Sequence, residues 1–297
     1  MTGIRLSIII VNYNTDTLLK DCLNSIFQYP PKKQFEIIVI DNGSTDDSVI
    51  MLEKDFSNIQ LIKNNSNLGF AKANNIGIKL SQGDYVLLLN SDTLILPESL
   101  NKIINYMDSH LSVGILGPRL TGLNGETLQM SWCGAPISLS GEIVIKLFSP
   151  KYISKYRFAR FIVDYIQRRE RKVMHIAGAS MIIRKKVFKD IGLLDENFFL
   201  FFEEPDFCWR ARKKCWDVVF NPDIKVIHKL GSSTKKLGSS VMIHYRKSQL
   251  YFYKKHHSKY QQNCLRLYLL IKFHALKILH QKNAEIYNQL IKLVKES

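Results

Sequence analysis

The sequence predicts an α/β fold in which helices cover a mostly parallel sheet. Short apolar segments alternate with amphipathic stretches over the first 130 residues, and polar loops follow three of these segments. In addition, 46% of the 297 residues are hydrophobic, which is sufficient for a packed core and excludes a disordered chain. The length suits one large domain or two smaller ones.

The first strand is expected over Leu6 to Val11, as a fully buried apolar run. A helix follows, because apolar residues recur there at helical spacing: Leu18, Leu19, Cys22, Leu23, Ile26 and Phe27. The next elements are the strand Phe35 to Ile40, a helix around Ser48 to Phe56, the strand Ile59 to Ile62, a helix around Gly69 to Ser81 and the strand Tyr85 to Leu89. Ligands bind such sheets at the carboxyl ends of the strands.

Charge is divided unevenly along the chain. Lys and Arg number 42 against 26 Asp and Glu, a net charge of +16. Residues 1–144 carry 10 basic and 14 acidic side chains, whereas residues 145–297 carry 32 basic and 12 acidic ones. The segment 145–172 is both basic and aromatic, with nine basic against two acidic residues. The two halves are therefore expected to meet different partners.

Several classes of protein are disfavoured. The five cysteines are scattered without a CxxC pair and are expected to be reduced thiols of a cytosolic protein. The apolar run near Met1 is too short to span a bilayer and precedes no cleavage site, so neither export nor an N-terminal anchor is expected. Neither a G-x-G-x-x-G nor a G-x-x-x-x-G-K-[ST] run occurs, which argues against a dinucleotide-dependent oxidoreductase and a P-loop NTPase.

Polar residues gather in the loops 11–14, 41–44 and 90–92, each directly after a predicted strand. Asp41 can accept hydrogen bonds from a nucleobase imide or a ribose hydroxyl, and Tyr13 offers a ring for stacking. A turn followed by a helix start is the structural alternative for the segment after Asp41. If the strand stays extended past Asn90, Asn90 and Asp92 point the same way and could address one ligand, and a carboxylate suits Mg²⁺ or Mn²⁺. A lone Asp in that place also serves as a helix cap.

Taken in order, six stretches of the chain resemble the inverting family-2 glycosyltransferases of GT-A fold, which is a Rossmann-like fold. The chain is most similar to the bacterial rhamnosyltransferase-like branch that builds surface polysaccharides. The stretches are 7–14 (SIIIVNYN), 36–48 (EIIVIDNGSTDDS), 67–78 (NLGFAKANNIGI), 85–93 (YVLLLNSDT), 175–216 and 226–234 (VIHKLGSST). Each stretch alone is a weak signal, but the occurrence of all six in the family's order is a strong one.

The resemblance implies a nucleotide-sugar site and a metal. The donor-binding positions that it implies are Val11, Tyr13, Asn14, Asp41, Asn42, Gly43, Ser44, Asn67, Gly69, Lys72, Asn75, Asn90, Ser91 and Asp92. Asp92 matches the last aspartate of the family D-x-D motif, a ligand of Mg²⁺ or Mn²⁺, and Asn90 stands in the first position. His228 matches a histidine that completes the metal site in some relatives, although a lone histidine there is also a common structural residue.

The resemblance also implies a catalytic base and an acceptor site. In the run FFEEPDF (201–207), Glu204 takes the place of the base, with Glu203 and Asp206 beside it. Like charges nearby would raise its pKa and favour proton abstraction. An acidic helix N-terminus is the structural alternative. Gly178, Ala179 and Trp209 are expected on the acceptor side, and a tryptophan can equally fill the core.

The C-terminal part is expected to form a basic amphipathic helix. Residues 264–279 place Leu267, Ile271, Ala275 and Ile278 on one face. Residues 229–297 carry 14 basic against 2 acidic side chains. Such a helix suits the interface of an anionic membrane, and a helix packed on the domain is the alternative. We expect a GT-A domain over 1–234, with a nucleotide-sugar half (1–130) and an acceptor half (131–234), followed by this region over 235–297.

The expected function is inverting transfer of a sugar from a nucleoside-diphosphate sugar to a glycan or polyprenyl-diphosphate-linked acceptor. Rhamnose from dTDP-rhamnose is the first donor expected. The alternatives are a UDP-hexose-dependent glycosyltransferase and a catalytically inactive nucleotide-sugar-binding protein. No nucleic-acid partner is expected, because the basic segments carry no recognition motif. The expected location is cytoplasmic, peripheral at the inner face of the plasma membrane.

Overall fold

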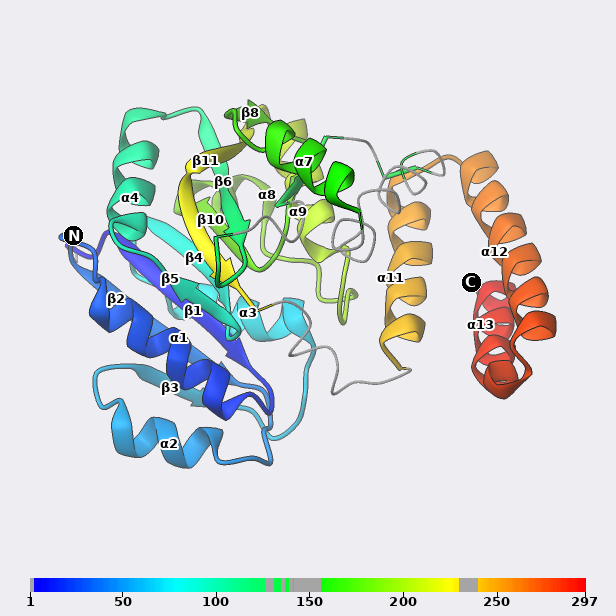
Figure 1. Cartoon of the computed structure of the whole chain (residues 1–297), viewed down its shortest axis with the longest axis horizontal. Coiled ribbons are helices and arrows are strands. Elements are labelled where there is room, and N and C mark those ends of the chain that lie inside the picture. Colours follow the sequence, from blue (N-terminus) through cyan, green and yellow to red (C-terminus); the bar gives the residue numbers. More distant parts are fainter. Residues whose placement is uncertain (1–2, 126–130, 135–136, 139–140, 142–155, 230–239) are drawn as a thin grey trace.

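The computed structural model describes residues 3–125, 131–134, 137–138, 141, 156–229 and 240–297 (Figure 1). The predicted division after residue 130 and the predicted boundary at 234/235 involve residues outside this described part, as does much of the basic segment 145–172. Within the described residues, a central sheet carries helices on both faces, and three longer helices form a C-terminal group.

The predicted alternation of strands and helices in the N-terminal half is confirmed in order and to within a few residues. The elements are β1 (Leu6–Asn12), α1 (Asp16–Gln28), β2 (Phe35–Asp41), α2 (Ser48–Asp55), β3 (Gln60–Lys63), α3 (Phe70–Leu80) and β4 (Tyr85–Asn90). Their strands lie in the order β3, β2, β1, β4, and all are parallel. The chain continues with β5 (Thr93–Ile95), α4 (Ser99–Ser109), β6 (Val113–Thr121) and β7 (Trp132–Cys133).

The second half adds both antiparallel and parallel strands to this sheet. Its elements are α7 (Arg157–Ile166), β8 (Arg171–Lys172), β9 (His175–Ile176), β10 (Ser180–Arg184), α8 (Lys185–Ile191), α9 (Glu203–Lys213) and β11 (Asp217–His228). Strand β10 lies between β4 and β6 and is antiparallel to both, with Ser180 opposite Leu89. The residues that precede β10 therefore lie at the edge where β4 ends.

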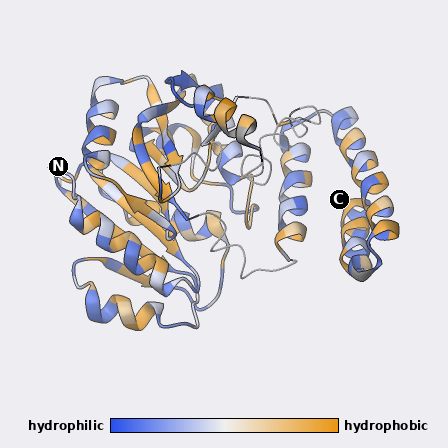
Figure 2. Ribbon diagram, viewed as in Figure 1, coloured by the Kyte–Doolittle hydropathy of each residue, from blue (hydrophilic) through white to orange (hydrophobic). Residues whose placement is uncertain are grey.

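Alternate residues of each central strand face opposite layers of the core, as the two-residue period of a strand requires. Ile8 and Ile10 of β1 pack with residues of α1 and α4, whereas Ile9 packs with residues of α3 and α9. Strands that are buried on both faces explain the continuous apolar runs of the sequence. Figure 2 shows the same concentration of hydrophobic residues in the central strands.

The C-terminal helices α11 (Ser240–His256), α12 (Lys259–Leu279) and α13 (Ala284–Glu296) share a third apolar core. Ser258 begins α12 with a capping box that includes Gln261. Phe198 and Phe202, which precede α9, are buried in the same core as Phe252 of α11. This core therefore continues into the segment that leads into α9.

Buried ion pairs tie α11 to α9. Asp206 is fully buried and accepts hydrogen bonds from Nε of Arg210 at 2.8 Å and Nε2 of His256 at 2.6 Å, while Nζ of Lys255 lies at 2.7 Å. Lys255 also contacts Asp195 at 2.6 Å. Burial alone would raise the pKa of Asp206, but the bonds from His256 and Lys255 and the charge of Arg210 outweigh it and lower that pKa. Asp206 is therefore a carboxylate that holds two helices together.

One face of α12 has no partner among the described residues. Leu267, Ile271 and Ile278 are 60%, 63% and 75% exposed, and they recur at the spacing of one helical face. The opposite face carries Leu265, Leu269 and Phe273 into the third core. The expected helix is thus present, with an apolar stripe on its solvent side. None of the described helices combines the length and the apolar character that crossing a bilayer requires.

Asp206→Asn is expected to lower the free energy of unfolding by about 3–5 kcal/mol, because it leaves buried cations without their carboxylate. Urea unfolding measures the change. Asp223→Asn is the matched control, since Asp223 is exposed, and it is expected to change stability by less than about 0.5 kcal/mol. Equal effects of the two substitutions would contradict the structural role of Asp206.

Candidate active site

Three polar loops meet at one edge of the sheet. β2, β1 and β4 are neighbours, and their register places Asn12 opposite Asp41 and Val11 opposite Asn90. The carboxyl ends of the three strands therefore lie side by side, as predicted for a ligand site in a parallel sheet.

Asp41 is held in one orientation at this edge. It is 2% exposed, and its carboxylate accepts hydrogen bonds from Nδ2 of Asn12 and from the backbone N–H of Ser44, both at 3.0 Å. Gly43 adopts φ +78°, and a Cβ there would approach Cα of Ser66 to 2.7 Å. The bond from Ser44 is that of a turn, so the turn and the ligand site are compatible uses of the same loop.

Asn42, in the second polar loop, anchors the next loop along the chain, residues 64–69. Its Nδ2 donates to Oδ1 of Asn67 at 2.8 Å, and its Oδ1 accepts from Nδ2 of Asn64 and from the N–H of Leu68 at 3.1 Å. Gly69 adopts φ +83°, where a Cβ would lie 2.4 Å from the carbonyl oxygen of Phe199. The loop is thus held against both β2 and the segment before α9.

The remaining residues predicted to bind the nucleotide-sugar donor have more varied surroundings. Asn14 has φ +55° and accepts the N–H of Thr45 at 2.7 Å, so it shapes the loop after β1. Asn75 is buried and donates to the carbonyl of Leu194 and to Glu196, at 2.8 and 3.0 Å. Val11 and Tyr13 are half-buried at the sheet edge, and Lys72 is exposed on α3.

Asp92 and His228 lie together beside the end of β4. Nε2 of His228 is 3.2 Å from Oδ1 of Asp92, yet this buried carboxylate oxygen accepts no hydrogen bond. The oxygen is therefore available to a cation, with an imidazole nitrogen beside it. The described residues contain no cluster of three or more metal-ligating side chains. A carboxylate and an imidazole are ligand types that would hold a Mg²⁺ or Mn²⁺ ion, and such an ion would supply positive charge at this edge of the sheet.

The acceptor-side loop joins the donor edge directly. The N–H of Asn90 donates to the carbonyl of Ala179 at 3.0 Å. Next to it, Gly178 lies against Glu204: a Cβ at residue 178 would fall 1.5 Å from Oε1 of Glu204. The structure thus brings the predicted base, the predicted acceptor loop and the Asn90–Asp92 turn together.

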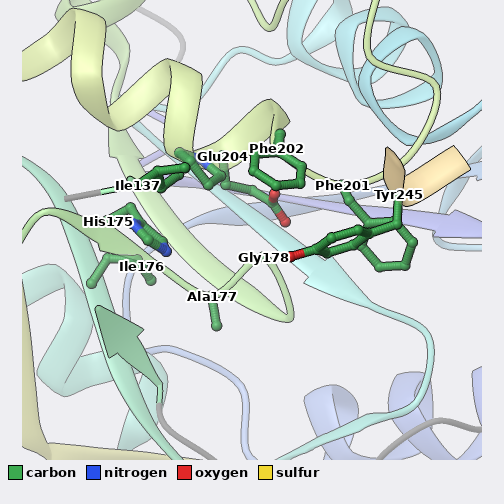
Figure 3. Close-up of a pocket in the computed structure, with 10 residues that line it drawn as sticks. Ile137, His175, Ile176, Ala177, Gly178, Phe201, Phe202, Glu204 and Tyr245 are labelled. Atoms are coloured by element: carbon green, nitrogen blue, oxygen red, sulfur yellow. The ribbon is translucent and has the colours of Figure 1, made fainter. Parts of the chain in front are cut away.

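A cavity of about 210 Å³ opens at this junction (Figure 3). Figure 3 shows the Glu204 carboxylate directed toward Gly178, with the rings of Phe201 and Tyr245 beside them. The lining residues are Ile137, His175, Ile176, Ala177, Gly178, Phe201, Phe202, Glu204, Pro205 and Tyr245. Trp209 is absent from this lining; its ring packs near those of Phe252 and His256, with centroids 6.4 and 5.2 Å away.

Sequence reasoning missed the aromatic and apolar walls of the cavity. Phe201 and Phe202 lie within the run FFEEPDF, so their nearness to Glu204 in the chain was a usable signal. His175 and Ile176 begin another of the six stretches. Tyr245, by contrast, comes from α11, and no local pattern marks it.

Backbone strain accompanies the predicted base, Glu204. Phe201 and Phe202 have φ of +69° and +71°, a conformation that costs bulky residues on the order of 1–3 kcal/mol each. Ring contacts hold Phe202: Tyr245 lies at 5.1 Å and Phe252 at 5.7 Å between centroids. Helix α9 begins at Glu203, directly after these two phenylalanines, so Glu204 lies in the first turn of the helix.

The two adjacent glutamates resist ionisation. Burial raises the pKa of Glu204 to about 7. Burial and the charge of Glu204 raise the pKa of Glu203 well above its usual range, and Oε2 of Glu203 is buried without a hydrogen bond. Asp206 lies elsewhere, in its ion pairs with α11.

Burial and the charge of Arg212 lower the pKa of His175 to about 4, so that its imidazole is neutral near pH 7.

Comparison with known proteins identifies the chain by family and by fold. The family model "Glycosyl transferase family 2" matches residues 7–192. An N-acetylglucosaminyl-diphospho-decaprenol L-rhamnosyltransferase of Mycobacterium tuberculosis is 25% identical over 275 residues, which cover 88% of each chain. The low-salt glycan biosynthesis hexosyltransferase Agl10 of Haloferax volcanii is 28% identical and covers 80% of this chain and 72% of its own.

Solved structures support the fold. Staphylococcus aureus TarS 1–349 in complex with UDP-GlcNAc superimposes with a TM-score of 0.55 at 20% identity, over 83% of this chain and 66% of that one. This chain therefore spans slightly less than two thirds of that structure, and the likeness concerns the fold alone.

Glu203→Gln is expected to stabilise the protein increasingly as pH rises. A group whose folded pKa is raised contributes stability that is complete below its unfolded pKa and is lost as pH rises through the folded value. The advantage of the variant in urea unfolding is therefore expected to grow as pH rises above the ordinary pKa of a glutamate. Glu285→Gln, at an exposed position, is expected to show no such trend. A flat difference for Glu203→Gln would contradict the raised pKa of the buried Glu203 carboxyl group.

Proposed function

The chain belongs to glycosyl transferase family 2 and is a glycosyltransferase, and we propose that it transfers its sugar with inversion to a hydroxyl group bound beside Glu204. The observation that carries this proposal is the position of Glu204, whose carboxyl group lies against Gly178 in the cavity lining and has a pKa of about 7. A base with a pKa near the working pH is suited to proton abstraction.

In the proposed reaction, Glu204 accepts the proton of the acceptor hydroxyl. At the same time, the oxygen of that hydroxyl attacks the anomeric carbon of the donor sugar. The bond from that carbon to the donor diphosphate breaks, and the diphosphate leaves with the electron pair. Asp41 would accept a hydrogen bond from the nucleoside, and the bonds that its carboxylate accepts from Asn12 and Ser44 support this role by fixing its orientation. Asp92 and His228 would hold a Mg²⁺ or Mn²⁺ ion, which when bound stabilises the charge of the leaving diphosphate.

The first donor that we propose is dTDP-rhamnose, and the acceptor is a glycan or a polyprenyl-diphosphate-linked sugar. The mycobacterial rhamnosyltransferase, which is similar over 88% of the chain, supports both. A UDP-hexose donor is the second candidate, supported by the similar hexosyltransferase and by the fold shared with TarS bound to UDP-GlcNAc. Transfer to any acceptor would exclude the inactive sugar-nucleotide-binding alternative.

Glu204→Gln is expected to reduce transfer by about 10²–10⁴-fold, because the amide cannot take the proton. Donor binding should persist, so dTDP-rhamnose, UDP-glucose or UDP-GlcNAc should raise the melting temperature of variant and wild type equally, with Mn²⁺ present. Wild-type kcat should rise with pH and reach half its maximum near pH 7. Glu285→Gln is the control. Substantial turnover by Glu204→Gln would place the base elsewhere.

We also propose that α12 binds an anionic membrane surface at the inner face of the plasma membrane. Its exposed stripe of Leu267, Ile271 and Ile278 belongs to a region with 14 basic against 2 acidic side chains. A second copy of the chain would bring the same positive charge to the stripe and be repelled. Anionic lipid headgroups offer the opposite charge, at about 1 kcal/mol for each basic residue near the surface. Lipid chains beneath them accept the apolar side chains.

The double substitution Leu267→Ser/Ile271→Ser is expected to weaken binding to vesicles of phosphatidylglycerol and phosphatidylcholine by at least about tenfold, since each apolar side chain gains about 1.5–3 kcal/mol when buried. Vesicle co-sedimentation measures this. Ile50→Ser removes an equally exposed apolar residue of α2 and should leave binding unchanged. Raising the salt concentration should release the wild-type protein. Unchanged binding of the double variant would overturn the proposal.

A further inference from the structure

An aromatic wall forms one side of the cavity beside Glu204. The rings of Phe201 and Tyr245 lie edge to face, with centroids 5.5 Å apart and an interplanar angle of 61°. Phe202 meets Tyr245 in a similar way at 5.1 Å. Figure 3 shows the rings of Phe201 and Tyr245 next to Gly178. Aromatic rings in such a wall offer flat apolar surface, and the C–H face of a pyranose is the matching surface of a sugar.

The cavity has little capacity for a second negative charge. Of the described lining residues, Glu204 is acidic and none is a lysine or arginine. His175 is neutral near pH 7. Arg246 stacks on the Tyr245 ring at 5.0 Å and bonds to Gln249, and it is absent from the lining. Among the described lining residues, an anionic group in the cavity would therefore face the Glu204 carboxylate without a lysine or arginine to balance it, which is costly at low dielectric.

The size of the cavity restricts what enters it. Pockets that bury drug-sized ligands usually enclose about 300–1,000 Å³, and this cavity of about 210 Å³ is smaller. One sugar ring is therefore a better match than an oligosaccharide or a sugar that carries a phosphate.

We propose that the cavity selects an uncharged pyranose as the acceptor unit, held against Phe201 and Tyr245, so that α11 supplies a specificity-determining residue. This inference rests on the proposed function, since it assigns the acceptor of the same site. A hydroxyl of the bound ring meets Glu204, and the apolar face of the ring lies on the aromatic wall. Any phosphate or carboxylate of the acceptor remains outside the cavity.

The first test compares two ligands that differ in one group. Methyl β-D-glucopyranoside is neutral, and methyl β-D-glucuronide has the same ring with a carboxylate at C6. In saturation-transfer NMR with the full chain at about pH 8, the neutral ligand is expected to bind at least about tenfold more tightly. Glu204→Gln should reduce this difference, because it removes the opposing charge. Equal affinity of the two ligands for the wild type, or no binding of the neutral one, would overturn the proposal.

The second test concerns the aromatic wall. Tyr245→Leu keeps bulk at the site and should weaken binding of the neutral ligand about fivefold to tenfold, whereas Tyr245→Phe should retain it. Met242→Ala, at an exposed position of the same helix, is the matched control. Thermal unfolding checks that each variant is folded. Unchanged affinity in folded Tyr245→Leu would contradict the role of Tyr245.

Donor assays separate this inference from the proposed function. If wild-type protein transfers sugar but does not distinguish the two ligands, the proposed specificity is wrong and the transferase function stands. If no donor raises the melting temperature and no transfer occurs, while the neutral ligand binds as expected, the proposed reaction is wrong instead.

Discussion

The antiparallel pairing of β10 with β4 is the constraint on which the site depends. Because Ser180 lies opposite Leu89, the residues before β10 emerge at the edge where the donor loops end. The bond from the N–H of Asn90 to Ala179 completes the junction. A parallel strand in the same place would direct its preceding loop to the opposite edge of the sheet. The orientation of one strand thus unites the edge proposed to bind the nucleotide with the proposed base carried by α9.

Around Glu204, the local structure is unfavourable and the surrounding structure compensates. Two bulky residues adopt left-handed backbone conformations, and of two adjacent carboxyl groups Glu203 is buried and Glu204 half-buried, with both pKa values raised. Such features persist where the rest of the fold is stable enough to hold them. Here the support comes from the sheet on one side and from the aromatic core of α11 on the other. The same burial that destabilises the Glu204 carboxylate makes it basic enough to take a proton.

Much of this arrangement was predictable from sequence, for identifiable reasons. Strands buried on both faces produce continuous apolar runs, so β1 to β4 and their helices were found in order. The ordered motifs also led to Gly178 and Glu204, which lie in contact. Tyr245 was not predictable, because its place in the cavity depends on how α11 packs, which no local pattern encodes. For the same reason, the ion pairs of Asp206 with α11 could not be read from the acidic run in which it occurs.

The strained Phe201–Phe202 turn has a consequence for the timing of activity during synthesis. Its support comes from Tyr245 and Phe252, which leave the ribosome after α9 has been made. A nascent chain that lacks α11 lacks these two ring contacts, so we expect the Phe201–Phe202 turn and the adjacent Glu204 to be less firmly held at that stage. We therefore expect the proposed base to become fully ordered only after the later helices have folded.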